Sequence, residues 1–450
     1  MVSDERNAHE GPATFREVFA QSEFRAVYAS GALTWFGDYL TKAAVTMLVY
    51  EQTDSVAMSA AAFAVSFLPW LIGGPLLTTL AERYPYRRVM VVCDLVRMGL
   101  ISLVAIPGLL PSQAILVVLF VSALANPPSQ AARSALMPTI LAGDRLVVGL
   151  GLITSTGQAA QFAGYLAGVG LASINPHLAL FVNTLTFALS AALIRFGVRH
   201  RPSAMTAAHR SHLLRETAEG FRIVFGTPVL RAIAILVFSS MLFAIVPEGL
   251  AAAWADKQSN GENAPLAQAM IMAASPVGFI LGGLVIGRGI RPELRQRLIR
   301  FFAILSPLAL VPALLNPPAP VVALLTAITG FAVAGLMPVA NGLFVRALPH
   351  GYRARAFGVM GTGTQVMQGV AVLLTGLLAN RYSIPLTVGL WSLAGTALML
   401  ITVLKWPTPD RFDAAIVEAR RSDPDDESEQ PATSGPQSRP PTSQAGVGSM

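Results

Sequence analysis

The sequence predicts an all-α membrane protein with twelve transmembrane helices in two pseudo-symmetric six-helix bundles. Three observations support this fold class. Of the 450 residues, 53% are hydrophobic and only 13% are charged, whereas soluble proteins carry about 25% charged residues. The apolar residues are concentrated in long runs. The cationic residues are concentrated in alternate connections between those runs.

The apolar runs have the length that a membrane helix needs. A helix requires about 20 apolar residues to cross a hydrocarbon layer of roughly 30 Å. Pro and Gly interrupt many of the runs, and membrane helices tolerate both residues because neighbouring helices satisfy the freed backbone groups. We number the predicted spans 1 to 12 in chain order: 24–50, 56–81, 88–109, 112–132, 147–173, 177–198, 229–255, 266–288, 297–316, 319–347, 354–380 and 384–405.

The positions of the 32 Lys and Arg residues predict an orientation. Lys42 lies within span 1, and only Lys257 and Arg381 fall in loops on one side of the membrane. The other cationic residues lie in or next to the opposite loops and the two termini. Cytoplasmic loops are enriched in Lys and Arg, so we expect a cell-membrane protein with both termini in the cytoplasm. The net charge of +7 then reflects topology, and no nucleic-acid partner is expected.

The two halves of the chain repeat a common pattern. Each half has two prolines eleven residues apart, a Gln-x-x-Gln pair and a double glycine. Parallel repeats are typical of transporters that bind substrate between the repeats, near the middle of the membrane. The matched positions are Pro127/Pro138 with Pro338/Pro349, Gln158/Gln161 with Gln365/Gln368, and Gly73/Gly74 with Gly282/Gly283.

The repeat and the polar stretches divide the chain into five predicted units. The final unit is rich in Pro and Ser, a composition typical of disorder. The units are a cytoplasmic N-terminal segment at 1–23, an N-terminal bundle at 24–198, a central cytoplasmic loop at 199–228, a C-terminal bundle at 229–405 and a disordered cytoplasmic tail at 406–450.

One loop resembles a known family signature. The stretch GGPLLTTLAERYPYRRVMVVCDLVR, which begins at Gly73, resembles the loop between spans 2 and 3 of the major facilitator superfamily, with an acid–Arg pair followed by an Arg pair. The stretches WFGDYLTKAAVTMLVYEQTDS and NPPSQAARSALMPTILAGDRL resemble the drug-exporter branch that contains enterobactin exporters and macrolide efflux proteins. The resemblance implies two bundles that rock to alternate access, usually driven by protons. Some antiporters of the family that this sequence resembles have a proton-coupling arginine in span 4. Here the part of span 4 from Gln113 to Asn126 contains no arginine.

Two charges of opposite sign lie inside span 1. Asp38 and Lys42 are four residues apart and therefore share a helix face. Each charge alone would cost about 2.5–3.5 kcal/mol at the centre of a membrane helix. We expect the pair to face a wet interior, where Asp38 exchanges a proton or contacts substrate and Lys42 adjusts its proton affinity. The alternative is a structural ion pair in which Lys42 reaches toward the outer interface.

Glu248 follows Pro247 in span 7, which is the equivalent of span 1 in the second half. It is predicted to be a second titrating group or an outward gate. The alternative is an acid at the membrane interface in contact with water.

A charged cluster is predicted to form a cytoplasmic gate. The resemblance implies a latch that biases the two transport states, and the alternative for the paired arginines is simple topology. Asp94 and Arg97 extend the cluster along span 3. The cluster comprises Glu82, Arg83, Arg87, Arg88, Asp94 and Arg97.

Amide side chains are predicted to line a substrate cavity. They carry hydrogen-bonding groups without charge, and the alternative is that they join helices to one another. The amides on spans 5 and 11 share one face of each helix. The predicted set is Gln158, Gln161, Gln365, Gln368, Asn126 and Asn341.

The sequence lacks the motifs of several enzyme classes. It contains no nucleotide-binding G-x-x-x-x-G-K-[ST] and no H-E-x-x-H, and Cys93 is its single cysteine. We therefore expect no enzyme, cofactor, nucleotide or metal site. The prediction is a secondary transporter that exports a small amphipathic compound, with protons and membrane lipid as further partners. A lipid or lysolipid translocase on the same fold and a transport-inactive scaffold or receptor stay open as alternatives.

Overall fold

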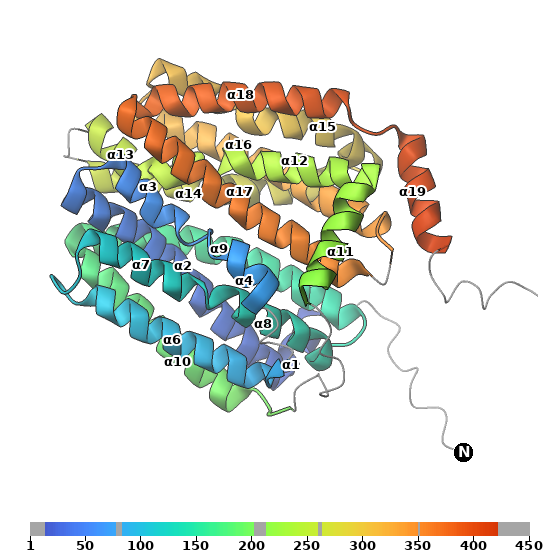
Figure 1. Ribbon diagram of the computed structural model, residues 1–450, viewed down its shortest axis with the longest axis horizontal. Coiled ribbons are helices and arrows are strands. Elements are labelled where there is room, and N and C mark those ends of the chain that lie inside the picture. Colours follow the sequence, from blue (N-terminus) through green and yellow to red (C-terminus); the bar gives the residue numbers. More distant parts are fainter. Residues whose placement is uncertain (1–13, 78–82, 202–212, 260–262, 350–351, 422–450) are drawn as a thin grey trace, which may run out of the picture.

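The structure is a computed structural model that describes residues 14–77, 83–201, 213–259, 263–349 and 352–421, and every regular element in these ranges is a helix. Most helices run side by side along the long axis of the molecule (Figure 1). The first half contains α1 (Phe15–Ala20), α2 (Ser22–Thr53), α3 (Val56–Ala64), α4 (Trp70–Leu77), α6 (Tyr86–Ala105), α7 (Ser112–Ala123), α8 (Asn126–Ile140), α9 (Asp144–Ile174) and α10 (Pro176–Gly197). The connection and the second half contain α11 (Leu213–Gly226), α12 (Pro228–Ala244), α13 (Val246–Ser259), α14 (Ala264–Gly289), α15 (Pro292–Leu308), the 3₁₀-helix η2 (Val311–Leu315), α16 (Ala319–Arg346), α17 (Arg353–Arg381), α18 (Ile384–Leu404) and α19 (Pro409–Arg421).

Nine helical segments among the described residues are long and apolar enough to cross a membrane. They confirm an all-α membrane protein. The three other predicted spans correspond to α2, to α3 with α4, and to α6. Helices α2 and α6 have 32 and 20 residues, which is long enough to span, but both carry buried or half-buried charges that lower their hydropathy. The count of twelve spans stays a prediction.

The helices form two bundles that pack against each other. In the first bundle, α2 packs against α9 and α10, and α10 packs against α6. In the second, α16 packs against α14 and α15. The bundles meet where α3 packs on α17 and where α9 packs on α14. Figure 1 shows the first bundle in blue to green below the second in lime to red.

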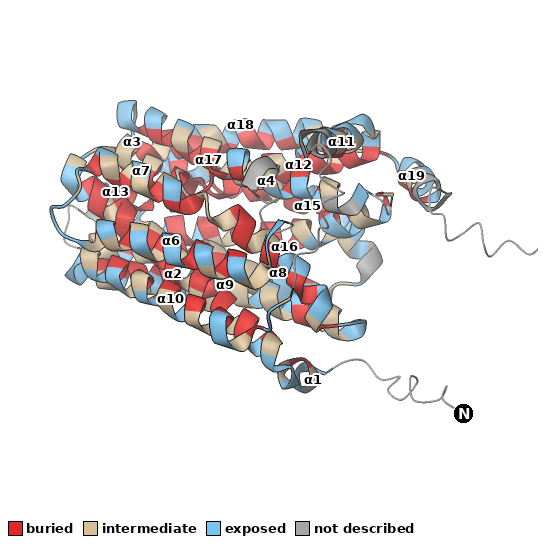
Figure 2. Cartoon of the chain, turned by 60° about the horizontal axis from the view of Figure 1, so that its bottom comes forward, coloured by how far each residue is buried: buried red, intermediate tan, exposed pale blue. Residues whose placement is uncertain are grey.

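The outer faces of the bundles are apolar. Large side chains such as Val117, Phe181 and Leu390 are at least half exposed. Figure 2 shows exposed residues along the outer sides of the helices and buried residues between them. Lipid chains solvate such faces, whereas water would not. The exposed apolar surface therefore agrees with a chain that lies in a bilayer.

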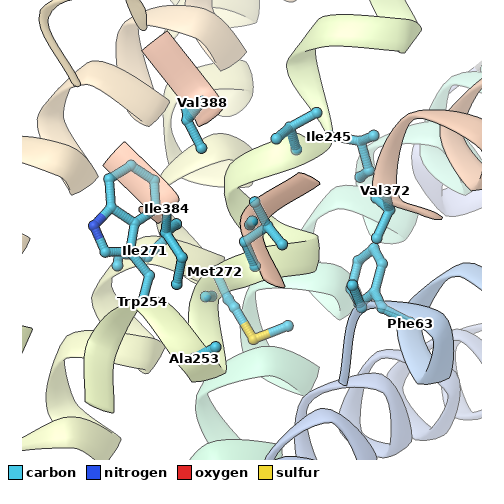
Figure 3. Close-up of a cluster of buried hydrophobic side chains, with 14 of the residues drawn as sticks. Phe63, Ile245, Ala253, Trp254, Ile271, Met272, Val372, Ile384 and Val388 are labelled. Carbon is cyan, nitrogen blue, oxygen red and sulfur yellow. The ribbon is translucent and has the colours of Figure 1, made fainter. Parts of the chain in front are cut away.

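The two bundles share an apolar cluster near the ends of α2 and α13. The first bundle contributes residues such as Tyr50 and Phe63, and the second contributes Trp254 and Val372. Figure 3 shows Phe63 from α3 beside Val372 from α17. The other large clusters of described residues lie either in the first bundle or in the second with α11. The bundles are therefore closed against each other on the side that the charge pattern predicts to be outside.

Span 4 extends further than the sequence indicated. We expected it to end at residue 132, but α7 and α8 together form one candidate membrane span from Ser112 to Ile140. The two prolines after Asn126 occupy the first turn of α8, where proline has no intrahelical hydrogen bond to lose. Arg133 consequently lies inside span 4, whereas the predicted membrane part of that span had no arginine.

Two segments predicted as loop or tail contain helices. The central loop at 199–228 includes α11, which is tied to α17 by an ion pair between Glu219 and Arg355 at 2.7 Å. The tail at 406–450 includes α19, and its Phe412 and Ile416 are buried against the second bundle. These two residues are four apart and share one helix face, a pattern that favours a docked helix. Residues 422–450 lie outside the described ranges.

The crossing of α14 and α16 depends on small residues, and it gives a first prediction. A Cβ at Gly278 would overlap the backbone of Ala327, whereas a Cβ at Gly283, five residues further along α14, meets nothing within 4 Å. Close membrane-helix crossings need such glycines. We expect Gly278→Leu to lower the unfolding midpoint in detergent, with a loss of about 1–3 kcal/mol from overpacking. Gly283→Leu is the matched control, and equal midpoints for the two variants would contradict the prediction.

Candidate functional site

Two cavities lie in the interior of the described chain. The first, here called the bundle cavity, has a volume of about 210 Å³ and lies within the first bundle, with Gln365 of α17 at its border. The second, here called the central cavity, has a volume of about 270 Å³ and is lined by both bundles. Tyr39, Lys42 and Gln365 line both cavities, which are therefore adjacent. A polar cavity between two repeats is the expected position of a transporter's substrate site.

Glu248 joins the two bundles in the central cavity. The span that carries it is interrupted between α12 and α13, and the acid lies in the first turn after this break. Its side chain is only 2% exposed. The carboxylate Oε2 accepts hydrogen bonds from Tyr165 Oη at 2.6 Å and from Gln161 Nε2 at 3.3 Å, both on α9 of the other bundle. A buried carboxylate of the second bundle is thus held by donors of the first.

Asp38 and Lys42 do not form the ion pair that their spacing suggested. Asp38 instead pairs with Arg97 of α6. The Lys42 ammonium lies over the rings of Phe67 and Tyr39, at 4.1 Å and 4.8 Å from the centroids, and no carboxylate of the described chain lies within 4.0 Å of it. The two side chains leave α2 toward different neighbours, and an aromatic face attracts a cation that has no acid beside it. Lys42 also lines both cavities and does not reach the outer interface.

Asp94 and Arg97 lie deep in the first bundle. Both are buried, with exposures of 0% and 4%. Asp94 accepts a hydrogen bond from Ser190 Oγ at 2.6 Å, and Arg97 lines the bundle cavity. We expected both residues to extend a cytoplasmic gate, but the structure places them in the interior of the first bundle. They face inward on α6 because a residue at i+3 returns to the same side of the helix, which here packs against α10.

The rest of the predicted gate lies elsewhere. Arg83 and Arg88 are exposed and Arg87 is half-buried, at or before the start of α6. Glu82 lies outside the described residues. The structure therefore separates Arg83, Arg87 and Arg88 from the buried Asp94 and Arg97.

Most of the predicted amides reach the cavities. Gln158, Gln161 and Gln368 line the central cavity, and Asn126 lines the bundle cavity. Gln365 lines both cavities and accepts a hydrogen bond at 2.9 Å from Gln368 Nε2. Asn341 is exposed on α16 and lines neither cavity. The repeat therefore brings together the glutamine pairs of spans 5 and 11, but not the two asparagines.

Sequence reasoning missed two residues that take part in the site. Tyr165 is fully buried and donates to Glu248. Arg133 is 5% exposed, lines the bundle cavity and lies over the ring of Trp35 at 5.8 Å. A basic residue seven positions after Asn126 was a usable signal for Arg133, because it follows two turns later on the same helix face. Tyr165 carried no comparable signal, since its role depends on the contact between α9 and α13.

The architecture and the site define a class of protein. A membrane-embedded helical chain with a polar cavity between two bundles has the architecture of a multi-pass membrane transporter. The family model described as Major Facilitator Superfamily matches residues 27–322 and 264–442, and the chain belongs to this family.

Relatives and solved structures agree with this membership. The chain is 25% identical to the multidrug efflux pump Tap of Mycolicibacterium fortuitum, over 76% of this chain and 86% of that protein. It is 22% identical to macrolide efflux protein A of Streptococcus pyogenes, over 85% of this chain and 95% of that protein. These similarities confirm the resemblance to the drug-exporter branch.

Two solved transporters share the fold at low sequence identity. A peptide transporter POT in complex with sulfate is 16% identical, covers 91% of this chain and 97% of its own, and has a TM-score of 0.67. The nucleoside transporter NupG is 18% identical, covers 88% of this chain and 99% of its own, and has a TM-score of 0.61. At these identities the likeness concerns the fold alone.

Proposed function

We propose that this transporter exports a small amphipathic compound from the cell by alternating access, coupled to proton antiport. Its place is the cell membrane, with both termini in the cytoplasm, as the positions of the cationic residues favour. The similarity to a multidrug efflux pump and to a macrolide efflux protein supports export of a compound of this kind.

The buried acid between the bundles carries the proposal. Glu248 of the second bundle is held by Tyr165 and Gln161 of the first, at the wall of the central cavity. An ionised carboxylate in this position is costly unless its hydrogen bonds are kept, whereas a protonated one is neutral. Binding and release of a proton therefore change how strongly the two bundles are joined. That dependence is what coupling between a proton and a rocking motion requires.

The packing supports alternating access. The apolar cluster shared by the bundles closes the predicted outer side, where Tyr50 also donates to Asp256 at 3.3 Å and Ser55 donates to Asn380 at 3.4 Å. Few polar contacts would have to break for these surfaces to separate. In this proposal Gln158, Gln365 and Gln368 contact the substrate, and the loop with Arg83, Arg87 and Arg88 biases the two states.

Transport by the reconstituted protein tests the proposal. Liposomes that contain the protein and a pH-sensitive dye are given a pH gradient, and cationic drugs, siderophores and lysolipids are added in turn. We expect one of these classes to accelerate the loss of the gradient, because its movement brings protons the other way. Empty liposomes are the control. The proposal fails if no class moves protons faster than the control and substrate uptake is unchanged by a proton uncoupler.

A further inference from the structure

Two arginines that line the bundle cavity carry buried hydrogen-bond donors without a partner in the described chain. Arg97 and Arg133 both line it and are 4% and 5% exposed. Arg97 Nε and Nη1 and Arg133 Nε have no hydrogen-bond partner among the described residues. Buried polar groups are nearly always paired, and an arginine carries five donors and no acceptor. These three nitrogens are themselves buried, so an acceptor in the cavity reaches them when the two guanidinium groups turn toward it.

The acceptors that the chain supplies are few. Arg97 donates to Asp38, and Arg133 donates to Ser30 Oγ through a long bond of 3.4 Å. Asp94 is also close to this network, and its Oδ1 has no partner among the described residues either, but Asp94 does not line the cavity. Three unpaired donors thus stand against one unpaired acceptor in this part of the described chain.

The charges inside the first bundle also favour an anionic ligand. Lys42 lines the cavity beside the two arginines, and its ammonium contacts aromatic rings instead of a carboxylate. The first bundle contributes three cationic side chains, Lys42, Arg97 and Arg133, and the two carboxylates of Asp38 and Asp94. Glu248 of the second bundle lines the central cavity together with Lys42. A cation in a membrane interior without an acid at ion-pair distance is costly, and an anion placed beside it lowers that cost.

We propose that the bundle cavity binds an anionic group of the transported compound, a carboxylate or phosphate, between Arg97, Arg133 and Lys42. Guanidinium groups bind such oxyanions through paired N–H donors. A cavity of about 210 Å³ has room for the group, and the apolar Trp35 and Phe187 on its wall suit the adjoining part of an amphipathic molecule. The substrate class is then amphipathic acids and zwitterions. This inference rests on the proposed function, because it assigns the ligand to the transported compound.

Binding of a matched pair of compounds tests the inference. The probes are 2-naphthoate and its uncharged analogue 2-naphthamide, added to the full-length protein in detergent and followed by tryptophan fluorescence, since Trp35 lines the cavity. We expect 2-naphthoate to bind at least about tenfold more tightly, because only the acid supplies charged acceptors. Equal affinity for the two probes would overturn the inference.

Three variants test whether the preference for 2-naphthoate over 2-naphthamide arises in the bundle cavity. Lys42→Gln and Arg133→Gln should each remove most of this preference. Arg133→Lys should keep part of the preference, because lysine has the charge of arginine without its paired donors. Arg381→Gln, at an exposed position on α17, is the control and should keep it. Lys42 has no carboxylate partner in the described chain, so Lys42→Gln leaves no acid unpaired and serves if the Arg133 variants do not fold. A preference that survives in Lys42→Gln would contradict the proposal.

Two further comparisons distinguish substrate binding from lipid binding and this inference from the proposed function. If 2-naphthoate binding is lost in phosphatidylglycerol nanodiscs but kept in phosphatidylcholine nanodiscs, the site belongs to a lipid headgroup and the assignment to substrate fails. If the protein transports neutral and cationic compounds without preferring the acid, the inference fails and the proposed function stands. If it binds the acid but drives no proton-linked transport of any compound, the proposed function fails instead.

Discussion

Glu248→Gln is expected to remove proton-driven transport while the protein still folds and exchanges substrate. Glutamine has the shape of glutamate, and its carbonyl oxygen can still accept the hydrogen bonds from Tyr165 and Gln161, but it cannot release a proton. The loss of rate under a pH gradient should exceed about tenfold, within the usual range of coupling between two sites. The measurement compares uptake driven by the gradient with exchange of labelled substrate at equal pH. Exchange should persist.

The controls for this prediction separate two candidate proton carriers. Glu248→Asp keeps a titratable group but shortens its reach to Tyr165, so we expect partial coupling. Asp38→Asn tests the carrier that the sequence favoured, and we expect it to keep most of the coupling because Asp38 is already paired with Arg97. If Glu248→Gln keeps full proton-driven uptake and Asp38→Asn loses it, the roles assigned to the two acids are wrong.

Local patterns in the sequence were enough to predict most of the fold. Apolar runs, the one-sided cationic loops and the repeated glutamine pairs are properties of single helices, so they can be read without knowing which helices touch. The glutamines at 158, 161, 365 and 368 reached the cavities because a repeat places equivalent helices at equivalent positions. Arg133 was missed because the predicted span ended at residue 132, one position before it, whereas α8 continues to Ile140.

Pairings between distant helices could not be predicted in the same way. Asp38 has Lys42 one turn away on its own helix, yet its partner is Arg97, 59 residues further along the chain. Local spacing sets which side chains are neighbours on one helix, whereas the choice between neighbours depends on the packing of α2 against other helices. Tyr165 and Glu248 are likewise joined only through the contact between two bundles. The chemistry of the site therefore depends on tertiary contacts that no single segment encodes.

Arg97→Gln is expected to be the most destabilising single change in the first bundle. It would remove the ion-pair partner of Asp38 and one of the cations close to Asp94, and the loss of one partner from a buried pair typically costs about 3–5 kcal/mol. The unfolding midpoint of the purified protein in one detergent measures the effect. Arg88→Gln, at an exposed position earlier on α6, is the matched control and should change stability by less than about 0.5 kcal/mol.

The double variant Asp38→Asn/Arg97→Gln shows whether the pair or the arginine alone matters. Removing both charges leaves no unpaired acid at position 38, so we expect the double variant to recover most of the stability that Arg97→Gln loses. If the double variant is no more stable than the single one, Arg97 acts mainly through Asp94 and the bundle cavity, and Asp38 is free to take part in transport. Recovery would instead identify the Asp38–Arg97 pair as a structural element of the first bundle, which leaves Glu248 as the acid that responds to protons.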